Sequence, residues 1–269
     1  MTMKTSFTVE FTGTGNAWSK PPVNYNTNAL IRVHGRAWLL DCGLLCPMAL
    51  HEMGIGLHTI DGVFISHLHG DHVLGLEELF FTNFFGHQRR IQLFLPTGLL
   101  SRYSGIEGSD IWENCLRGAM ESTAFDGQHE RLLSLEDYAQ VHVLEPHRPT
   151  DILGLKCEIF DVEHVRHRPS YGMILDERVA YTSDCTYHLS RIEKLLERGV
   201  ETLFHEVTFT PYSPGIVHTT FGELAALPKD IAERMILMHY GDQTSEDMFK
   251  AAEDLGFRIA RRGIVYDFS

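Results

Sequence analysis

The chain has 269 residues, of which 43% are hydrophobic and 22% are charged. These fractions are close to the globular average, so collagen, coiled coil and disorder are excluded as descriptions of the whole chain. Its 23 lysines and arginines against 36 aspartates and glutamates give a formal net charge of −13. This charge argues against broad, unspecific nucleic-acid binding, which requires a basic surface, although it is compatible with a local basic groove.

The cysteines and the N-terminal segment indicate where the protein resides. The five cysteines are odd in number, widely spread and free of C-x-x-C spacing, so they predict free thiols in a reducing compartment rather than a disulfide framework. Residues 1–13 lack the apolar core of a signal peptide. No stretch approaches 18 consecutive apolar residues, so no membrane span is predicted. We therefore expect a cytoplasmic protein that has no contact with a membrane.

Strands and helices alternate along the chain. Alternating or short β-rich apolar runs predict strands at residues 6–11, 29–33, 37–40, 63–65, 91–95, 141–144, 155–162, 171–175, 178–182, 202–204, 235–238 and 263–268. Helical spacing predicts helices at residues 47–53, from 73 onward, at 98–103, 191–197, 221–227 and 245–255. Because the two kinds of element mix throughout, without a repeat or a linker, we predict one α/β domain over residues 1–269.

The segment 104–135 has the weakest pattern. Its apolar residues recur at helical spacing in a polar setting, and these are Ile111, Trp112, Cys115, Leu116, Ala119 and Met120. They favour a helix that covers the core. A dimer contact or a lid over a substrate is the alternative.

Sixteen residues are histidines, and the densest cluster is Ser66-His67-Leu68-His69-Gly70-Asp71-His72. It follows an apolar strand and precedes a helix, which is where α/β folds place ligands. Residues two apart in an extended chain point the same way, so His67 and His69 can bind one metal ion. Asp71 and His72 lie beyond the glycine and can serve a second ion. Three imidazoles and a carboxylate within six residues would be costly to bury without a cation.

The pattern His67-x-His69-x-Asp71-His72 resembles the signature of the metallo-β-lactamase superfamily. That superfamily also has an aspartate after an early strand, a histidine after a mid-chain strand, a further aspartate and a late histidine. The matching residues, in the right order, are Asp41, His164, Asp184 and His239. The resemblance covers nearly the whole chain and implies the four-layer αββα metallo-β-lactamase fold.

The same resemblance implies a dinuclear metal centre, with two zinc ions per chain. Manganese or iron would also suit nitrogen and oxygen ligands. The implied ligands are His67, His69 and His164 for one ion, Asp71, His72 and His239 for the other, and Asp184 between them. Asp41 is expected to orient the histidine loop rather than to touch metal. His167 competes with His164 as a ligand, and His164 is favoured because it closes the strand.

Two further motifs resemble those of the tRNA 3′-processing endonucleases, ribonuclease Z. These are Phe204-His205-Glu206-Val207-Thr208-Phe209 and Val217-His218-Thr219-Thr220. The resemblance implies attack on phosphorus by a metal-held hydroxide, with Asp71 positioning or deprotonating the water. It makes His218 the general acid and Glu206 its partner, with His205 as a support. The opening turn Phe11–Gly15 is also similar, and Trp18 stands where a dinucleotide-binding loop would need its third glycine.

The chain departs from ribonuclease Z in two places. Only Asp176-Glu177-Arg178 joins two strands where that family inserts a long arm that grips tRNA. Tyr240-Gly241-Asp242 follows His239 where that family has other residues. With the net charge of −13, the missing arm favours a small phosphodiester, above all a 3′,5′-cyclic mononucleotide. The chain resembles the armless cyclic nucleotide phosphodiesterases of the anti-Pycsar type.

The sequence is also compatible with three alternative functions. These are a tRNA 3′-processing endonuclease with an atypical tRNA-binding region, an ester or lactone hydrolase, and a non-catalytic sensor stabilised by metal. The favoured interpretation implies no stable nucleic-acid binding, and the resemblance implies a homodimer. Four aromatic residues are candidates for stacking on a base, although a structural role is expected for each: Trp112, Tyr138, Phe209 and Tyr212.

Overall fold

The computed structural model describes residues 4–125 and 127–269. Residues 1–3, on which the prediction of no signal peptide partly rests, and residue 126, in the segment of weak pattern, lie outside the described residues. Most strands belong to two seven-stranded sheets. The first has the order β16-β1-β2-β3-β4-β5-β8, made of β1 (Phe7–Gly13), β2 (Asn28–Val33), β3 (Arg36–Leu40), β4 (Gly62–Phe64), β5 (Ile91–Pro96), β8 (Ala139–Leu144) and β16 (Val265–Phe268).

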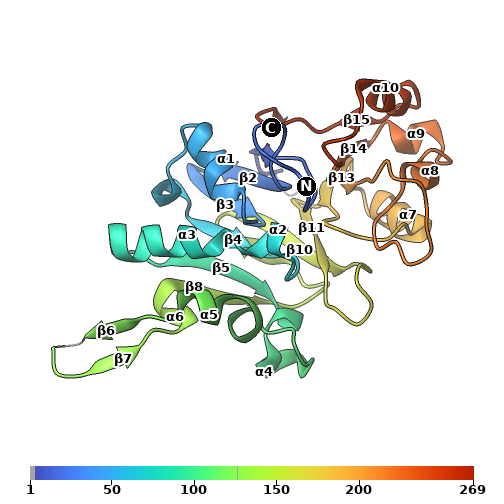
Figure 1. The fold of residues 1–269 in the computed structure, drawn as a ribbon. Helices are drawn as coiled ribbons and strands as arrows, with labels where there is room; N and C mark the ends of the chain where they lie inside the picture. The colour runs from blue at the N-terminus through green and yellow to red at the C-terminus, as the bar shows by residue number, and fades with distance from the viewer. Residues whose placement is uncertain (1–3, 126) are drawn as a thin grey trace.

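The second sheet has the order β15-β14-β13-β12-β11-β10-β9. Its strands are β9 (Thr150–Ile152), β10 (Leu155–Asp161), β11 (Tyr171–Leu175), β12 (Val179–Tyr181), β13 (Thr202–Glu206), β14 (Met235–Met238) and β15 (Arg258–Ile259). A separate hairpin pairs β6 (Thr123–Phe125) with β7 (Glu130–Leu132). This hairpin projects from the body of the molecule at the lower left of Figure 1.

The helices lie outside the two sheets. They are α1 (Cys46–Glu52), α2 (Gly70–Val73), α3 (Leu76–Phe81), α4 (Ser101–Ser104), α5 (Arg117–Met120), α6 (Leu135–Tyr138), α7 (Leu189–Glu197), α8 (Phe221–Leu224), α9 (Lys229–Ala232) and α10 (Glu246–Asp254). Shorter helical turns are η1 (Leu57–Thr59), η2 (Thr82–Gly86), η3 (Thr97–Leu99) and η4 (Trp112–Leu116). In Figure 1, α1 and α3 lie to the left of the strands and α7 to α10 to the right. This is the four-layer arrangement expected from the sequence.

Successive side chains of the central strands of the second sheet point to opposite faces, so these strands contribute to two separate cores. Phe204 and Ile236 belong to the larger core, which also contains the apolar residues of the first sheet. Their neighbours Leu203 and Leu237 point the other way, into a separate core with Ile192 of α7. A sheet covered on both faces gives strands that are apolar throughout, which is why these segments read as short apolar runs.

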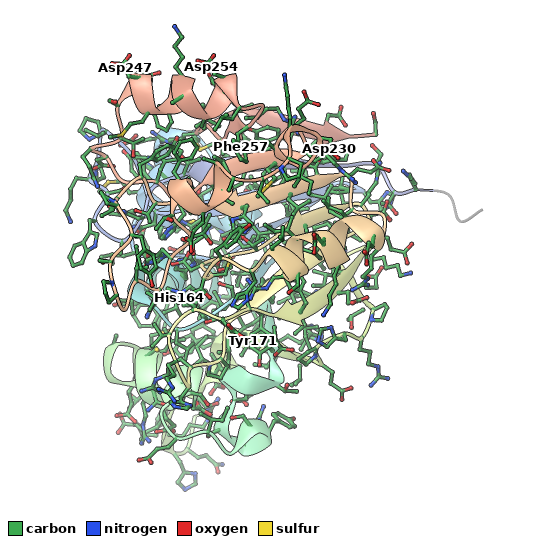
Figure 2. The ribbon with its side chains drawn as sticks, turned by 90° about the vertical axis from the view of Figure 1, so that its right-hand side faces the viewer. His164, Tyr171, Asp230, Asp247, Asp254 and Phe257 are labelled. Carbon is green, nitrogen blue, oxygen red and sulfur yellow. The ribbon has the colours of Figure 1, made fainter. Side chains whose placement is uncertain are left out.

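The helix α10, in the outer layer, likewise has one side exposed to solvent and one side that packs on the sheet. Figure 2 shows Asp247 and Asp254 at the outer edge of this helix, with Phe257 below it on the side of the sheet. Phe257 is buried, and both aspartates are exposed. Ser245 caps the helix, since its side chain accepts a hydrogen bond from the Met248 amide. Among the described residues, no helix is long and apolar enough to cross a membrane.

The parallel strands bring the candidate ligand and catalytic residues to the carboxyl ends of the strands. In the first sheet β3, β4, β5 and β8 run parallel, and in the second β12, β13, β14 and β15 do. Asp41 follows β3, His67 follows β4, Asp184 follows β12, Glu206 ends β13 and His239 follows β14. The carboxyl ends of parallel strands are where such folds gather their ligands.

The connection between β11 and β12 is a tight turn, as expected. Asp176 and Glu177 adopt positive φ angles of 47° and 62°, and the Arg178 amide donates to the Leu175 carbonyl at 3.2 Å. This is the geometry that joins two adjacent antiparallel strands directly. The described chain therefore has no room for an arm between these strands.

Some predicted elements were wrong in extent. The helix predicted at 98–103 is split into η3 and α4, because Leu100 is buried in an extended conformation. Asp110 fixes the break, since its Oδ2 accepts hydrogen bonds from the amide and the hydroxyl of Ser101 at 3.0 and 2.8 Å. The helix predicted at 221–227 ends at Leu224. In the segment 104–135, η4 and α5 supply the expected helical residues, and Ile111 joins the larger core.

Candidate active site

The first group of candidate metal ligands consists of His67, His69, His164 and Asp184. His69 Nδ1 lies 3.1 Å from His67 Nε2 and 3.1 Å from His164 Nε2. Asp184 Oδ2 lies 3.9 Å from the Nε2 atom of His67 and 3.9 Å from that of His164. All four ligand atoms fall within 4.8 Å of one another. Such convergence of nitrogen and oxygen atoms suits a divalent metal ion.

The second group consists of Asp71, His72, Asp184 and His239. Asp71 Oδ2 is 3.5 Å from the Nε2 atoms of both His72 and His239. Asp184 Oδ1 is 3.3 Å from His72 Nε2, and its Oδ2 is 3.2 Å from His239 Nε2. Asp184 is therefore common to both groups. The structure brings together the same two sets of residues that the sequence resemblance implied.

Hydrogen bonds on the far side of the His164 and His72 rings fix which nitrogen faces the groups. His164 Nδ1 donates to the Val217 carbonyl at 2.9 Å, so its Nε2 atom presents a lone pair. His72 Nδ1 lies 2.9 Å from the carboxylate of Asp41, with the same consequence. Partners of this kind set the tautomer and the orientation of metal-binding imidazoles.

The charges also fit bound cations. The buried Nε2 atoms of His72 and His239 have no hydrogen-bond partner within the described part of the chain. Burial lowers the pKa of His67 and of His164, which keeps both neutral. Burial also lowers the pKa of His239, but Asp184, Asp71 and Glu206 outweigh it and raise the pKa to about 10. His67 and His164 are thus ready to bind a metal ion, whereas the carboxylates that hold a proton on His239 would attract a divalent cation in place of that proton.

Asp41 lies behind the second group and holds the histidine loop. Its Oδ1 accepts from the Ser66 amide at 2.7 Å, and its Oδ2 accepts from the Ser66 hydroxyl at 2.8 Å. The Tyr181 hydroxyl donates to Oδ2 at 3.1 Å. Asp41 is fully buried and adopts a positive φ of 63°, an uncommon conformation that asparagine and aspartate tolerate best. Its contacts match the orienting role expected from the sequence.

Glu206 and His218 form a pair beside the two groups. Glu206 Oε2 lies 2.8 Å from His218 Nδ1 and 3.4 Å from His239 Nδ1, and the Cys185 amide donates to Oε1. Glu206 is fully buried, whereas His218 is partly exposed. The candidate ligand atoms of Glu206, His218 and His239 also lie within 4.8 Å of one another. Since both imidazoles direct an Nδ1 atom at the carboxylate, the contacts are hydrogen bonds that orient the rings.

Two cavities adjoin the site on different sides. The first, of about 380 Å³, is lined by His67, His69 and His164 together with residues of the segment 99–115 and the loop 165–170. The second, of about 340 Å³, is lined by His69, Asp71, Asp184, His218 and His239 together with residues of the loops 16–18 and 208–216. His69 lines both cavities, so they meet at the histidine cluster. Figure 2 labels His164 and Tyr171, which flank the loop 165–170 that lines one side of the first cavity.

The comparison of the whole chain with known families gives its membership. Residues 7–266 match the family model of anti-Pycsar protein Apyc1. The chain belongs to the anti-Pycsar Apyc1 family. It is 35% identical over 260 residues to the Apyc1 protein of Saccharibacillus brassicae, covering 96% of this chain and 98% of that relative. It is 33% identical over 267 residues to the Apyc1 protein of Bacillus phage BSP38, covering 94% and 96%.

Solved structures confirm the fold of this Apyc1 family member. The metallo-β-lactamase fold protein YhfI from Bacillus subtilis matches with a TM-score of 0.72 and 16% identity, covering 98% of this chain and all 100% of that one. Human tRNase Z, short form, matches with a TM-score of 0.64 and 22% identity, covering 96% and 98%. The metallo-β-lactamase fold that the sequence resemblance implied is therefore confirmed.

The structure of this Apyc1 family member also places the three other histidines named from the sequence, His164, His167 and His205. His164 lies in the first group, whereas His167 is exposed and has a positive φ of 63°. His205 lies on the opposite face of β13 from Glu206, because neighbouring residues of a strand point to opposite faces. Its ring contacts Cys185 Sγ at 3.9 Å, so it supports the loop after Asp184 from behind.

The aromatic residues considered for base stacking have structural roles or lie elsewhere. Trp112 and Tyr138 pack together with ring centroids 6.3 Å apart, and Phe209 belongs to an aromatic cluster of the C-terminal helices. Tyr212 is exposed. None of these four described residues lines either cavity. Trp18 does line the second cavity, which the sequence could not indicate because its loop is placed by contacts with the far end of the chain.

Proposed function

We propose that the protein is a dinuclear metal-dependent phosphodiesterase that hydrolyses 3′,5′-cyclic mononucleotides. The observation that carries the proposal is the shared carboxylate of Asp184 between two groups of ligand atoms, next to the pair formed by Glu206 and His218. The anti-Pycsar name of its relatives supports a cyclic nucleotide as substrate.

The residues fit two ions, with zinc favoured and manganese or iron possible. His67, His69 and His164 would hold one ion, Asp71, His72 and His239 the other, and Asp184 both. When bound, two such ions supply Lewis-acid stabilisation of phosphoryl oxygens and lower the pKa of water. Asp41, through His72 and Ser66, would keep the ligand loop in place.

Asp71 is proposed to orient the attacking water. Burial raises the pKa of this carboxyl, but His72 and His239 outweigh it and hold the pKa well below its usual range. Asp71 is thus a carboxylate, able to accept a hydrogen bond from water. It lines the second cavity, where a substrate phosphate would meet it.

His218 is proposed to give a proton to the departing ester oxygen. Its Nδ1 is engaged by Glu206, so in the protonated ring Nε2–H is available to a leaving group. Water adds to phosphorus, one P–O ester bond breaks, and the leaving oxygen receives the proton. Hydrolysis of one ester bond therefore converts a cyclic nucleotide into a nucleoside monophosphate. An alkoxide is a poor leaving group, which is why a separate acid matters here.

The tight turn between β11 and β12 supports a small substrate over a transfer RNA. Asp176 and Glu177 leave no space there for an arm, and the net charge of −13 disfavours a long phosphate backbone. We also propose a homodimer, which the family resemblance supports, and a cytoplasmic location, which the free cysteines favour. Light scattering tests the dimer, since a monomeric mass would refute it.

The proposal is tested by incubating zinc-loaded protein with cyclic mononucleotides, linear dinucleotides and a precursor transfer RNA in parallel. Hydrolysis of cyclic AMP or cyclic CMP by the wild type, abolished in His69→Ala, is the expected result. Cleavage of precursor transfer RNA without cyclic nucleotide turnover would refute the proposal. Turnover of a lactone that is unaffected by His218→Ala would instead favour an ester hydrolase.

A further inference from the structure

Trp18 is an exposed aromatic residue on a firmly held loop. Its side chain is 81% exposed, so it contributes little to the core. The loop is tied to the segment that follows His239: the Tyr240 amide donates to the Thr14 carbonyl at 3.2 Å, and the Lys20 amide donates to Asp242 Oδ2 at 2.7 Å. The backbone is thus fixed on both sides of the exposed indole.

The interior of this loop is closely packed. A Cβ atom on Gly15 would lie 2.1 Å from Ser19 Oγ, so the chain leaves no space for a side chain there. The Trp18 amide donates to Asn16 Oδ1 at 3.0 Å, which closes a local turn. A rigid turn that holds a large aromatic ring away from the core is a typical platform for stacking.

Trp18 shares a cavity with the proposed proton donor. The second cavity is lined by His218 and Asp184 and also by Trp18, Ile216 and Gln243. Ile216 offers an apolar surface, and the Gln243 amide offers both a donor and an acceptor. This combination suits a flat, polar-edged ring such as a nucleobase.

The chemistry of a cyclic phosphodiester decides which side of the phosphate the base occupies. Both ester oxygens belong to the same ribose. In an in-line displacement the attacking water stands opposite the leaving oxygen, so the ribose and its base remain on the leaving side. That side faces His218, which lines the second cavity. The first cavity is not lined by His218, and its described lining residues include no phenylalanine, tyrosine or tryptophan.

We propose that Trp18 stacks on the base of the bound nucleotide and is a principal determinant of substrate affinity. This inference rests on the proposed function and adds the place of the base to it. Stacking tolerates every base, because each has a flat π-face.

The kinetic test compares Trp18→Ala and Trp18→Phe with the wild type. The substrates are cyclic AMP and the base-free 1-O-methylribose 3′,5′-cyclic phosphate. Trp18→Ala is expected to raise KM for cyclic AMP by roughly five-fold or more, with kcat little changed, because loss of one base–aromatic stack has that size. The base-free substrate is expected to be unaffected, and Trp18→Phe to retain most of the affinity.

A matched control is Tyr212→Ala, since Tyr212 is 67% exposed but does not line the described cavity. Its KM for cyclic AMP is expected to stay at the wild-type value. An equal rise in KM for both substrates in Trp18→Ala, or no rise at all, would overturn the assignment.

Fluorescence separates this inference from the proposed function. Cyclic AMP is expected to quench the tryptophan emission of the His218→Ala protein, and the added change Trp18→Phe is expected to abolish the quenching, although Trp38 and Trp112 remain. Quenching that depends on Trp18, together with no hydrolysis of cyclic AMP by the zinc-loaded wild type, would leave the stacking intact and refute the phosphodiesterase. Quenching that survives Trp18→Phe, or no quenching by saturating cyclic AMP, would overturn the stacking.

Discussion

Glu206 Oε2 lies 2.8 Å from His218 Nδ1, which joins a fully buried carboxylate to an imidazole at the edge of a cavity. Burial lowers the pKa of His218, but Glu206 and Asp184 outweigh it, and the net pKa is raised above the ordinary value. The two carboxylates therefore favour the protonated form of the ring, which is the form that a proton donor needs. This relationship allows the proposed role of His218 to be tested by pH.

Glu206→Gln is expected to move the alkaline limb of the pH–rate profile to lower pH. The carboxylate raises the pKa of His218, so an uncharged amide lowers that pKa, and the acid loses its proton earlier as pH rises. The measurement is kcat for cyclic AMP across the pH range. Glu246→Gln is the control, since that side chain is exposed on α10. An unshifted alkaline limb in Glu206→Gln would contradict the coupling.

His218→Ala is expected to slow cyclic AMP hydrolysis by roughly 10²–10⁴-fold, the usual contribution of a general acid. A p-nitrophenyl phosphodiester should be affected far less, because p-nitrophenolate departs without a proton. Steady-state rates on the two substrates give the comparison. Equal losses on both would show that His218 has another role.

Asp41→Asn is expected to weaken zinc binding by about 10–100-fold, as loss of such supporting carboxylates does. Asparagine tolerates the positive φ of this position, so the backbone need not change. Equilibrium dialysis of the apoprotein measures the affinity. The control is Asp254→Asn at the exposed end of α10. Wild-type affinity in Asp41→Asn would mean that the hydrogen bond to His72 does not support metal binding.

Gly43→Ala is expected to destabilise the fold by about 3 kcal/mol, a large overpacking effect. A Cβ atom on Gly43 would lie 1.8 Å from the backbone oxygen of Asp71, so one of the two loops must move. Denaturant unfolding gives the free energy. Gly222→Ala is the matched control, because a Cβ there meets no atom within 4 Å. Similar unfolding free energies for the two variants would contradict this packing.

The sequence predicted most of the fold because the long elements each bury a regular face. Strands such as β13 and β14 alternate between two cores, and their apolar runs are visible without a structure. The hairpin β6–β7 was not predicted, because its residues are almost wholly exposed and leave no apolar pattern. The two residues of β15 and the three of β9 join their sheet through pairing, which no local pattern records.

The candidate site was predicted where its residues form local motifs. His67 to His72 are contiguous, and His164, Asp184 and His239 each follow a predicted strand. Trp18 was missed, since contacts with the far end of the chain, such as the one between Lys20 and Asp242, 222 residues apart, place its loop beside the site. A contact between residues so far apart in the chain leaves no recognisable pattern in a single sequence.

The central claim is tested most directly by ³¹P NMR of cyclic AMP incubated with the zinc-loaded protein in H₂¹⁸O. The account predicts that the cyclic phosphodiester resonance is replaced by a phosphomonoester carrying one ¹⁸O on phosphorus. The same conversion should be absent in His69→Ala. A cyclic resonance that persists unchanged with the zinc-loaded wild type would contradict the account.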